Sequence, residues 1–214
     1  MCYHTKQTKP ATEVQRRFNA TIEKAELFKS SSHFNAFDFP VMPIILNENQ
    51  NLIQFGQWGL IPDYKLNSDI KKYTLNARIE SIHQKESFKD YEEQRCLILA
   101  DGFYEWKWLD SKGKIKNKYE IGIENYALFS FAGLFSHWKN PQTNELMTTF
   151  TMLTTVANEL MSEIHNIKKR MPIILHQKDE ESFLSGEELE RFSFPNYEIK
   201  LVAKNLEAQQ RLFD

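Results

Sequence analysis

The sequence has 214 residues and a mass of 25.3 kDa, enough for one sizeable domain. Hydrophobic residues make up 41% and charged residues 26%, and 27 basic against 29 acidic side chains leave a net charge of −2. This balance excludes a wholly disordered chain, a collagen-like chain and a strongly basic nucleic-acid-binding tail.

The predicted elements of the first half are one helix and two strands, followed by a charged segment. Apolar residues recur at helical spacing over residues 12–28, which predicts an amphipathic helix that a polar stretch then ends. Two apolar runs, 41–46 and 52–61, predict strands joined by a turn-rich loop. Residues 77–93 are charged and broadly helical.

The second half consists mainly of predicted strands with tight turns between them. A short helix is expected at 158–165, and two short acidic helices are expected near 178–192. Strands are expected at 95–108 (bent at Asp101-Gly102), 118–124, 126–138, 146–156, 171–175 and 197–203. Such an order favours an antiparallel α+β fold over alternating βαβ units. No repeat or long linker divides the chain, so a single domain over residues 1–214 is expected.

The cysteine content and the hydropathy indicate a compartment. Two cysteines, Cys2 and Cys96, are too few for a disulfide framework. The first residues lack the charged and apolar regions of a signal peptide, and no apolar stretch approaches the roughly 20 residues of a membrane span. We therefore expect a reduced, cytoplasmic protein without a membrane partner.

Cys2 is a candidate reactive residue because of its position. Removal of Met1 would leave a free α-amine and a thiol on one exposed first residue. An amine with a pKa near ~8 is partly neutral at physiological pH and condenses with an aldehyde to an imine. The adjacent thiol can add to that imine and close a five-membered ring. The alternative is that Cys2 is incidental.

Glu105 lies among aromatic residues in Gly102-Phe103-Tyr104-Glu105-Trp106. In a strand it shares a face with Phe103, and a carboxylate buried there needs a partner or a proton. It is therefore a candidate acid or base with a perturbed pKa. The alternative is a glutamate at a strand edge that points to solvent.

Two further polar residues have both a structural and a chemical interpretation. Asn76, in Asn76-Ala77-Arg78-Ile79-Glu80, could cap a helix or aim its amide into a site. His165 ends the short predicted helix, where the helix dipole favours a cation and would raise the imidazole pKa for proton transfer. A plain capping histidine is the alternative.

Basic and aromatic residues suggest local rather than global contacts with nucleic acid. Phosphate contacts could come from Lys71-Lys72 with Arg78, or from Lys168-Lys169-Arg170, although such clusters are also ordinary solvated surface. Candidates for base stacking are Trp58, Trp106, Trp108 and Tyr64. The histidines show no metal-ligand spacing and no nucleotide-binding motif is present, so neither a metal nor a nucleotide is expected.

Six short motifs occur in the order typical of one family. The chain resembles the SRAP family, the abasic-site-processing proteins first named SOS-response-associated peptidases, from Cys2 to about Lys204. The motifs are Met1-Cys2, Trp58-Gly59-Leu60-Ile61-Pro62, Asn76-Ala77-Arg78-Ile79-Glu80-Ser81, Asp101-Gly102-Phe103-Tyr104-Glu105-Trp106, Phe131-Ala132-Gly133-Leu134, and Ile164-His165 leading to Arg170-Met171-Pro172. The resemblance implies an α+β fold with a largely antiparallel, barrel-like β-sheet flanked by short helices.

The resemblance also implies a reaction. Family members link the processed N-terminal cysteine covalently to an abasic site in single-stranded DNA, where the opened sugar is captured as a thiazolidine. On this basis Cys2 supplies amine and thiol, and Asn76 positions the chain start. Glu105 takes or holds the amine proton, and His165 assists ring opening and proton transfer. The same Glu105 and His165 are implicated in the release of Met1, a self-processing peptidase step.

The implied partner is single-stranded DNA that contains abasic sites, bound by a monomer without a cofactor. Arg78 and Arg170 would hold flanking phosphates, and Trp106 would pack against a neighbouring base. The chain departs from the family pattern in two places. Tyr3-His4 replaces the usual Gly-Arg, and Asn166-Ile167-Lys168-Lys169 separates His165 from Arg170.

Two alternatives to this function remain from the sequence. Cys2, His165 and Glu105 could act as nucleophile, base and orienting group of a cysteine peptidase. The aromatic and basic residues could instead form a non-catalytic module that binds single strands reversibly.

Overall fold

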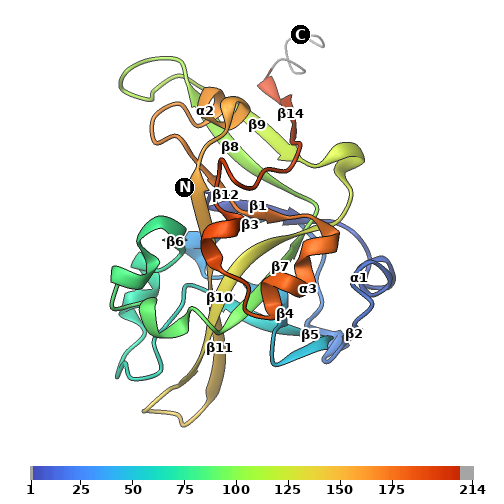
Figure 1. Cartoon of the computed structure of the whole chain (residues 1–214), viewed down its shortest axis with the longest axis vertical. Helices are drawn as coiled ribbons and strands as arrows, with labels where there is room; N and C mark the ends of the chain where they lie inside the picture. The colour runs from blue at the N-terminus through green and yellow to red at the C-terminus, as the bar shows by residue number, and fades with distance from the viewer. Residues whose placement is uncertain (1, 208–214) are drawn as a thin grey trace.

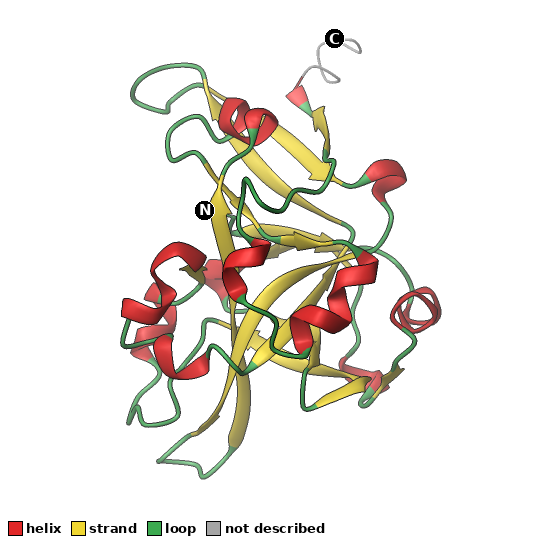
Figure 2. Ribbon diagram, viewed as in Figure 1, coloured by secondary structure: helices red, strands yellow, loops and turns green. Residues whose placement is uncertain are grey.

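A computed structural model describes residues 2–207, and strands dominate it (Figures 1 and 2). The strands are β1 (His4–Gln7), β2 (Thr21–Ile22), β3 (Ser31–Asn35), β4 (Val41–Leu46), β5 (Asn49–Trp58), β6 (Asn76–Arg78), β7 (Arg95–Ala100), β8 (Gly102–Trp108), β9 (Lys116–Gly122), β10 (Phe129–Lys139), β11 (Leu146–Val156), β12 (Arg170–Pro172), β13 (Ile174–Leu175) and β14 (Val202–Asn205). The α-helices are α1 (Ala11–Phe18), α2 (Glu159–Ile164) and α3 (Glu180–Leu184). Short 3₁₀ helices are η1 (Ala25–Leu27), η2 (Ala36–Asp38), η3 (Asp69–Tyr73), η4 (Ile79–Gln84), η5 (Lys89–Tyr91), η6 (Glu124–Tyr126), η7 (Gln177–Asp179) and η8 (Leu189–Phe192).

Five strands close into a mixed barrel. β11, β10, β7, β4 and β5 pair antiparallel in that order, and a parallel pairing of β11 with β5 completes the ring. The other pairings in this sheet attach β12, β13, β6 and β2 to it. The expected α+β class with a largely antiparallel, barrel-like sheet and short flanking helices is therefore confirmed.

A second sheet of five strands, in the order β14-β9-β8-β1-β3, lies against one end of the barrel (Figure 1). β7 and β8 belong to different sheets although only Asp101 separates them, so the chain bends there as expected. The strand β1 lies between β8 and β3, which ties the beginning of the chain into the middle of this sheet.

Alternating side chains of the barrel strands form two hydrophobic clusters. One fills the barrel and includes Ile44, Ile98, Phe131 and Phe150, with Trp58 stacked on Phe150. The interior is tight, because a Cβ on Gly56 would lie 2.6 Å from Ile44 Cδ1. This cluster continues into the second sheet through Phe103 and reaches Cys2. The other cluster packs outward beneath the short helices and includes Val14 of α1 and Phe183 of α3.

Several boundaries differ from the predictions. The first helix ends at Phe18 rather than at residue 28, because Asn19 adopts a left-handed conformation and caps it. Residues 77–93 contain two short helices, as expected, but both are 3₁₀ helices (η4 and η5), and the segment begins in the strand β6. The last strand covers 202–205 rather than 197–203, and the strands β1 and β3 were not predicted. Among the described residues, no helix is long and apolar enough to cross a membrane.

Candidate active site at the start of the chain

The pairing of β1 with β8 places Cys2 beside Glu105. In this antiparallel pair, Thr5 is opposite Phe103 and Lys6 is opposite Gly102. Going back along the chain from Thr5 toward Cys2 therefore corresponds to going forward along β8 from Phe103 toward Glu105. Cys2 is 0% exposed and belongs to the hydrophobic cluster that fills the barrel. In the full chain, residue 2 is therefore buried, and the exposure of Cys2 as a first residue after the release of Met1 stays a prediction.

Burial governs the chemistry of the Cys2 thiol. Loss of hydration raises its pKa well above the ordinary range, and the nearby carboxylate of Glu105 raises it further. The Sγ atom donates a weak hydrogen bond to the carbonyl oxygen of His4 at 3.7 Å. The group is consequently a neutral thiol, not a resident thiolate.

Asn76 holds the backbone of Cys2. It begins β6, whose parallel pairing with β11 places it opposite Met152, and its Nδ2 donates a hydrogen bond to the Cys2 carbonyl oxygen at 2.9 Å. The helix-cap interpretation is wrong, because Asn76 lies in a strand and its amide reaches the chain start. Its Oδ1 atom is buried without a hydrogen-bond partner among the described residues.

Glu105 is a buried carboxyl group rather than an exposed edge residue. It is 7% exposed and shares the inner face of β8 with Phe103, as the alternation predicted. Burial raises its pKa to about 7. Its Oε1 has no hydrogen-bond partner among residues 2–207. Both protonation states are therefore populated near neutral pH, which suits a group that accepts and returns a proton.

His165 is the residue after α2, at its C-cap, as the capping interpretation predicted. Its Nδ1 lies 2.8 Å from the Arg170 carbonyl oxygen, which can only accept, so Nδ1 carries hydrogen and a neutral ring has its lone pair on Nε2. The expectation of a raised pKa is wrong. Burial lowers the imidazole pKa and outweighs the hydrogen bond to Arg170.

The four predicted catalytic residues converge to different degrees. Cys2 contacts Asn76 directly and interacts electrostatically with Glu105. His165 directly follows α2, and this helix packs against β8, the strand of Glu105. The helix also contributes Ile164 to the cluster that contains Cys2. Among the described residues, no group of three or more His, Cys, Asp or Glu side chains is arranged to hold a metal ion.

Of the expected DNA contacts, Arg78 and Trp106 are accessible and Arg170 is not. Arg78 is exposed and, with Asn76, lines a groove of about 520 Å³ that also includes Tyr73, Lys85 and Phe88. Trp106 is half-buried on the second sheet. Arg170 is 8% exposed, and its guanidinium forms a two-pronged ion pair with Glu80.

The other candidates for base stacking divide in the same way. Trp58 is fully buried and donates its Nε1 hydrogen to the Leu75 carbonyl oxygen at 2.7 Å, so it is a core residue. Tyr64 is 52% exposed and Trp108 is half-buried, so both remain accessible. Among the candidates for phosphate contact, Lys72 is exposed.

The sequence analysis missed a surface cluster beside the site. His4 Nδ1 and His33 Nε2 share a hydrogen bond at 2.9 Å, and the His4 ring meets Trp106 edge-on at 4.7 Å. Lys118 lies over Tyr104 and Trp106. Because His33 comes from β3, which carries no strong strand pattern, no spacing in the sequence could have joined it to His4.

The fold and the site define a β-barrel protein in which a buried cysteine at residue 2 lies beside an amide and a buried carboxyl group. The family model described as SOS response associated peptidase (SRAP) matches residues 1–208. The chain belongs to this family, as its motif order predicted.

Relatives and solved structures agree with the family. The protein YoqW of Bacillus subtilis, named an abasic site processing protein, is 38% identical over 175 residues, which cover 79% of this chain and 74% of YoqW. HMCES of Pongo abelii, also named an abasic site processing protein, is 29% identical over 157 residues, 44% of its own length. A crystal structure of a protein from Bacteroides thetaiotaomicron superposes with a TM-score of 0.85 at 32% identity, over 95% of this chain and 91% of that one.

Proposed function

We propose that the protein captures abasic sites in single-stranded DNA through residue 2, once removal of Met1 has left Cys2 with a free amine beside its thiol. The observation that carries the proposal is the environment of Cys2. Asn76 holds its carbonyl oxygen at 2.9 Å, and the buried carboxyl group of Glu105, with a pKa of about 7, lies beside it. Membership of the SRAP family and the names of the relatives support the substrate class.

The proposed reaction is a condensation without any change of oxidation state. The neutral amine of residue 2 adds to the aldehyde of the ring-opened sugar, and the resulting carbinolamine loses water to give an imine. The thiol sulfur then adds to the imine carbon while the thiol proton passes to nitrogen. One C–N and one C–S bond form, the aldehyde oxygen leaves as water, and the product is a thiazolidine.

Glu105 suits the proton transfers of this sequence. As a carboxylate it accepts a proton from the ammonium form of the amine, and as an acid it returns that proton to the departing hydroxyl group. A pKa of about 7 lets one group do both near neutral pH. The buried thiol remains protonated until the imine forms, which keeps its proton available for the ring nitrogen.

His165 is proposed to assist opening of the sugar. Its Nδ1 is occupied by the Arg170 carbonyl oxygen, and its lowered pKa keeps the ring neutral. A neutral imidazole with a lone pair on Nε2 can accept the proton of the anomeric hydroxyl as the ring opens. Peptide cleavage in trans is disfavoured by the same electrostatics, because a thiol with a strongly raised pKa supplies almost no thiolate. Peptidase-like activity is therefore proposed only for the release of Met1.

Binding is proposed to depend on the phosphate backbone and on stacking. Arg78 is exposed in the groove that Asn76 also lines, where it can contact a phosphate without displacing another protein group. Trp106, the residue after Glu105 in β8, presents a partly exposed ring, and stacking against a base does not require a particular sequence.

Intact-mass measurement tests the proposal. Purified protein should lack the mass of one methionine, and an oligonucleotide with one abasic site should add its own mass minus one water as a heat-stable adduct. The Cys2→Ala variant should form at most a labile imine that borohydride traps. Cys96→Ala is the matched control, because Cys96 is the other buried cysteine and lies within β7, and it should react like the wild type.

Two results would contradict the proposal. The first is a heat-stable adduct of full yield from Cys2→Ala. The second is equal competition by intact and abasic oligonucleotides for reversible, salt-sensitive binding, which would indicate a non-catalytic single-strand-binding module instead.

A further inference from the structure

We infer that Glu80 is a positioning residue that acts through Arg170 to fix the imidazole of His165, so that Arg170 is an internal anchor rather than a phosphate ligand. The consequence for the reaction rate rests on the proposed function. The structural part, the effect of Glu80 on the ring of His165, can be tested without any DNA.

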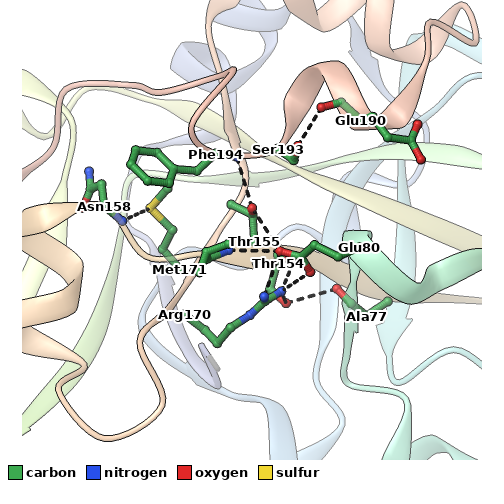
Figure 3. A network of polar contacts seen from close by, with 11 residues as sticks. Ala77, Glu80, Thr154, Thr155, Asn158, Arg170, Met171, Glu190, Ser193 and Phe194 are labelled. Carbon is green, nitrogen blue, oxygen red and sulfur yellow. Dashed lines mark hydrogen bonds and ion pairs between the residues drawn. The ribbon is translucent and has the colours of Figure 1, made fainter.

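The side chain of Arg170 is committed to protein groups (Figure 3). Its two terminal nitrogens donate to the two carboxylate oxygens of Glu80 at 2.8 and 2.9 Å. One of them also donates to the Thr154 carbonyl oxygen at 2.7 Å. Only 9% of this side chain is exposed, and its Nε is buried without a partner among the described residues. A phosphate could bind the guanidinium only if it displaced Glu80.

Glu80 in turn is held by the barrel. Its Oε1 accepts hydrogen bonds from the Val156 backbone nitrogen at 3.1 Å and from Thr155 Oγ1 at 3.3 Å. Val156 is the residue that pairs with Arg170 between β11 and β12. The carboxylate therefore links η4 to the C-terminal end of β11 and to the side chain of Arg170 in β12. Arg170 is thus held both by its backbone pairing and by its side chain.

The backbone of Arg170 transmits this constraint to His165. The Arg170 carbonyl oxygen accepts the hydrogen bond of His165 Nδ1 at 2.8 Å. The four residues between them form a closed loop, in which the Lys169 nitrogen donates to the His165 carbonyl oxygen at 2.9 Å and Lys169 has a φ of 46°. The insertion thus brings Arg170 back against the histidine instead of moving it away. Loss of the Glu80 contact would release the acceptor that sets the tautomer of His165.

Electrostatics support an anchor over a DNA contact. Burial alone would raise the pKa of Glu80, but hydrogen bonds from Arg170 outweigh it and lower the pKa, so the pair is ionised and nearly neutral overall. A neutralised arginine presents little field to a phosphate. Arg78, which lies two residues before Glu80, is exposed in the groove and provides the contrast.

Nitrogen NMR of the histidine rings is the first test, with the His165→Gln variant used for assignment. In the wild type, His165 should be the Nδ1–H tautomer. In Glu80→Gln and in Arg170→Gln, both tautomers should be populated. Glu163→Gln is the matched control, because it removes an exposed ion pair with Lys107 on the helix that precedes His165 and does not touch Arg170. An unchanged tautomer in both test variants would overturn the inference.

The salt dependence of single-strand binding is the second test. For single strands, one lost phosphate contact lowers the slope of log affinity against log salt by about 0.7. We expect this change for Arg78→Gln and no change for Arg170→Gln. A slope for Arg170→Gln that falls as it does for Arg78→Gln would show that Arg170 is a phosphate ligand after all.

Adduct formation at saturating abasic DNA is the third test. Because small misplacement of a reacting group is costly, Glu80→Gln should slow the rate by about 10- to 100-fold while leaving the DNA affinity unchanged. Arg170→Lys keeps the charge but loses the two-pronged geometry, so it should slow the reaction similarly. A phosphate ligand would instead tolerate lysine, and near-wild-type rates for Arg170→Lys would contradict the anchor role. If the wild type forms no adduct, the proposed function fails, but the NMR result still decides whether Glu80 positions His165.

Discussion

Glu105 and Glu80 are the same residue type in opposite environments. Glu105 is 7% exposed, has an oxygen without a partner, and has a pKa raised to about 7 by burial. Glu80 is bound by an arginine, a hydroxyl and a backbone amide, and its pKa is lowered. Glu80 is also the more exposed of the two, with 38% of its side chain exposed. The comparison teaches that burial and hydrogen bonding together decide whether a carboxyl group remains available for proton transfer.

The difference also separates two structural roles. A buried carboxyl group with one oxygen that lacks a hydrogen bond costs stability, and its place beside Cys2 fits the proposed role of a proton acceptor. A fully bonded carboxylate is held rigidly and can transmit position to its neighbours. The two environments are built by different sheets: β8 of the second sheet carries Glu105, and β11 with β12 of the barrel sheet receives Glu80.

The largest expected effect is the loss of proton transfer in Glu105→Gln. General acid–base groups contribute about 10²- to 10⁴-fold, so adduct formation should slow by that range. In the wild type the rate should rise with pH up to the pKa of about 7, and this inflection should vanish in the variant. Single-turnover measurements over pH 5–9 check both. A variant that retains the inflection would assign it to another group.

The Glu105→Gln variant should also change how the free energy of unfolding depends on pH. The pKa of Glu105 is higher in the folded state than in the unfolded chain, so the folded protein binds this proton more tightly. Its contribution to the free energy of unfolding is complete below the unfolded pKa, near 4.5, and is lost as pH rises through about 7. The loss is on the order of 3 kcal/mol. Denaturation at pH 5 and pH 8 should show a smaller difference in Glu105→Gln than in the wild type.

The next effect is a loss of stability in Glu80→Gln. Because the pKa of Glu80 is lowered in the folded state, its contribution is present above the unfolded pKa and is lost as pH falls. Breaking a fully buried pair costs about 3–5 kcal/mol. The Glu80 side chain is 38% exposed, so we expect about 1–2 kcal/mol at pH 7. Thermal denaturation checks this value, and equal stability of Glu80→Gln and Glu163→Gln would contradict it.

The long barrel strands could be predicted from the sequence, but the closure of the barrel could not. Residues 95–108 and 146–156 have apolar runs that match strands, and Gly102 follows the bend at Asp101 between the two sheets. The parallel pairing of β11 with β5 joins Phe150 to Trp58, far apart in the sequence. The polar strand β3 was missed because its residues, partly exposed on both sides, lack an alternating pattern.

The site could be predicted only where the motifs carry its residues. The motif order predicts catalytic roles for Cys2, Asn76, Glu105 and His165, and these roles stay predictions. The alternation of β8 predicted the shared face of Phe103 and Glu105. The burial of Cys2 and the sign of the His165 pKa shift could not be predicted, because both depend on tertiary desolvation. In the case of His165, burial outweighs the dipole of the six-residue helix α2.

The smallest expected effect concerns a third arrangement, the neutral pair of His4 and His33. Burial, and after it the proximity of His33, lowers the pKa of His4 to about 4. A hydrogen bond contributes about 0.5–1.5 kcal/mol even when it is well formed, and His33 is exposed. His33→Leu should therefore change the unfolding free energy at pH 7 by less than about 1 kcal/mol. NMR titration should show the His4 pKa moving upward toward its ordinary value. A downward shift of the His4 pKa would contradict the effect assigned to His33. A loss of stability as large as that of Glu80→Gln would mean that this pair of neutral groups stabilises the protein as strongly as an ion pair.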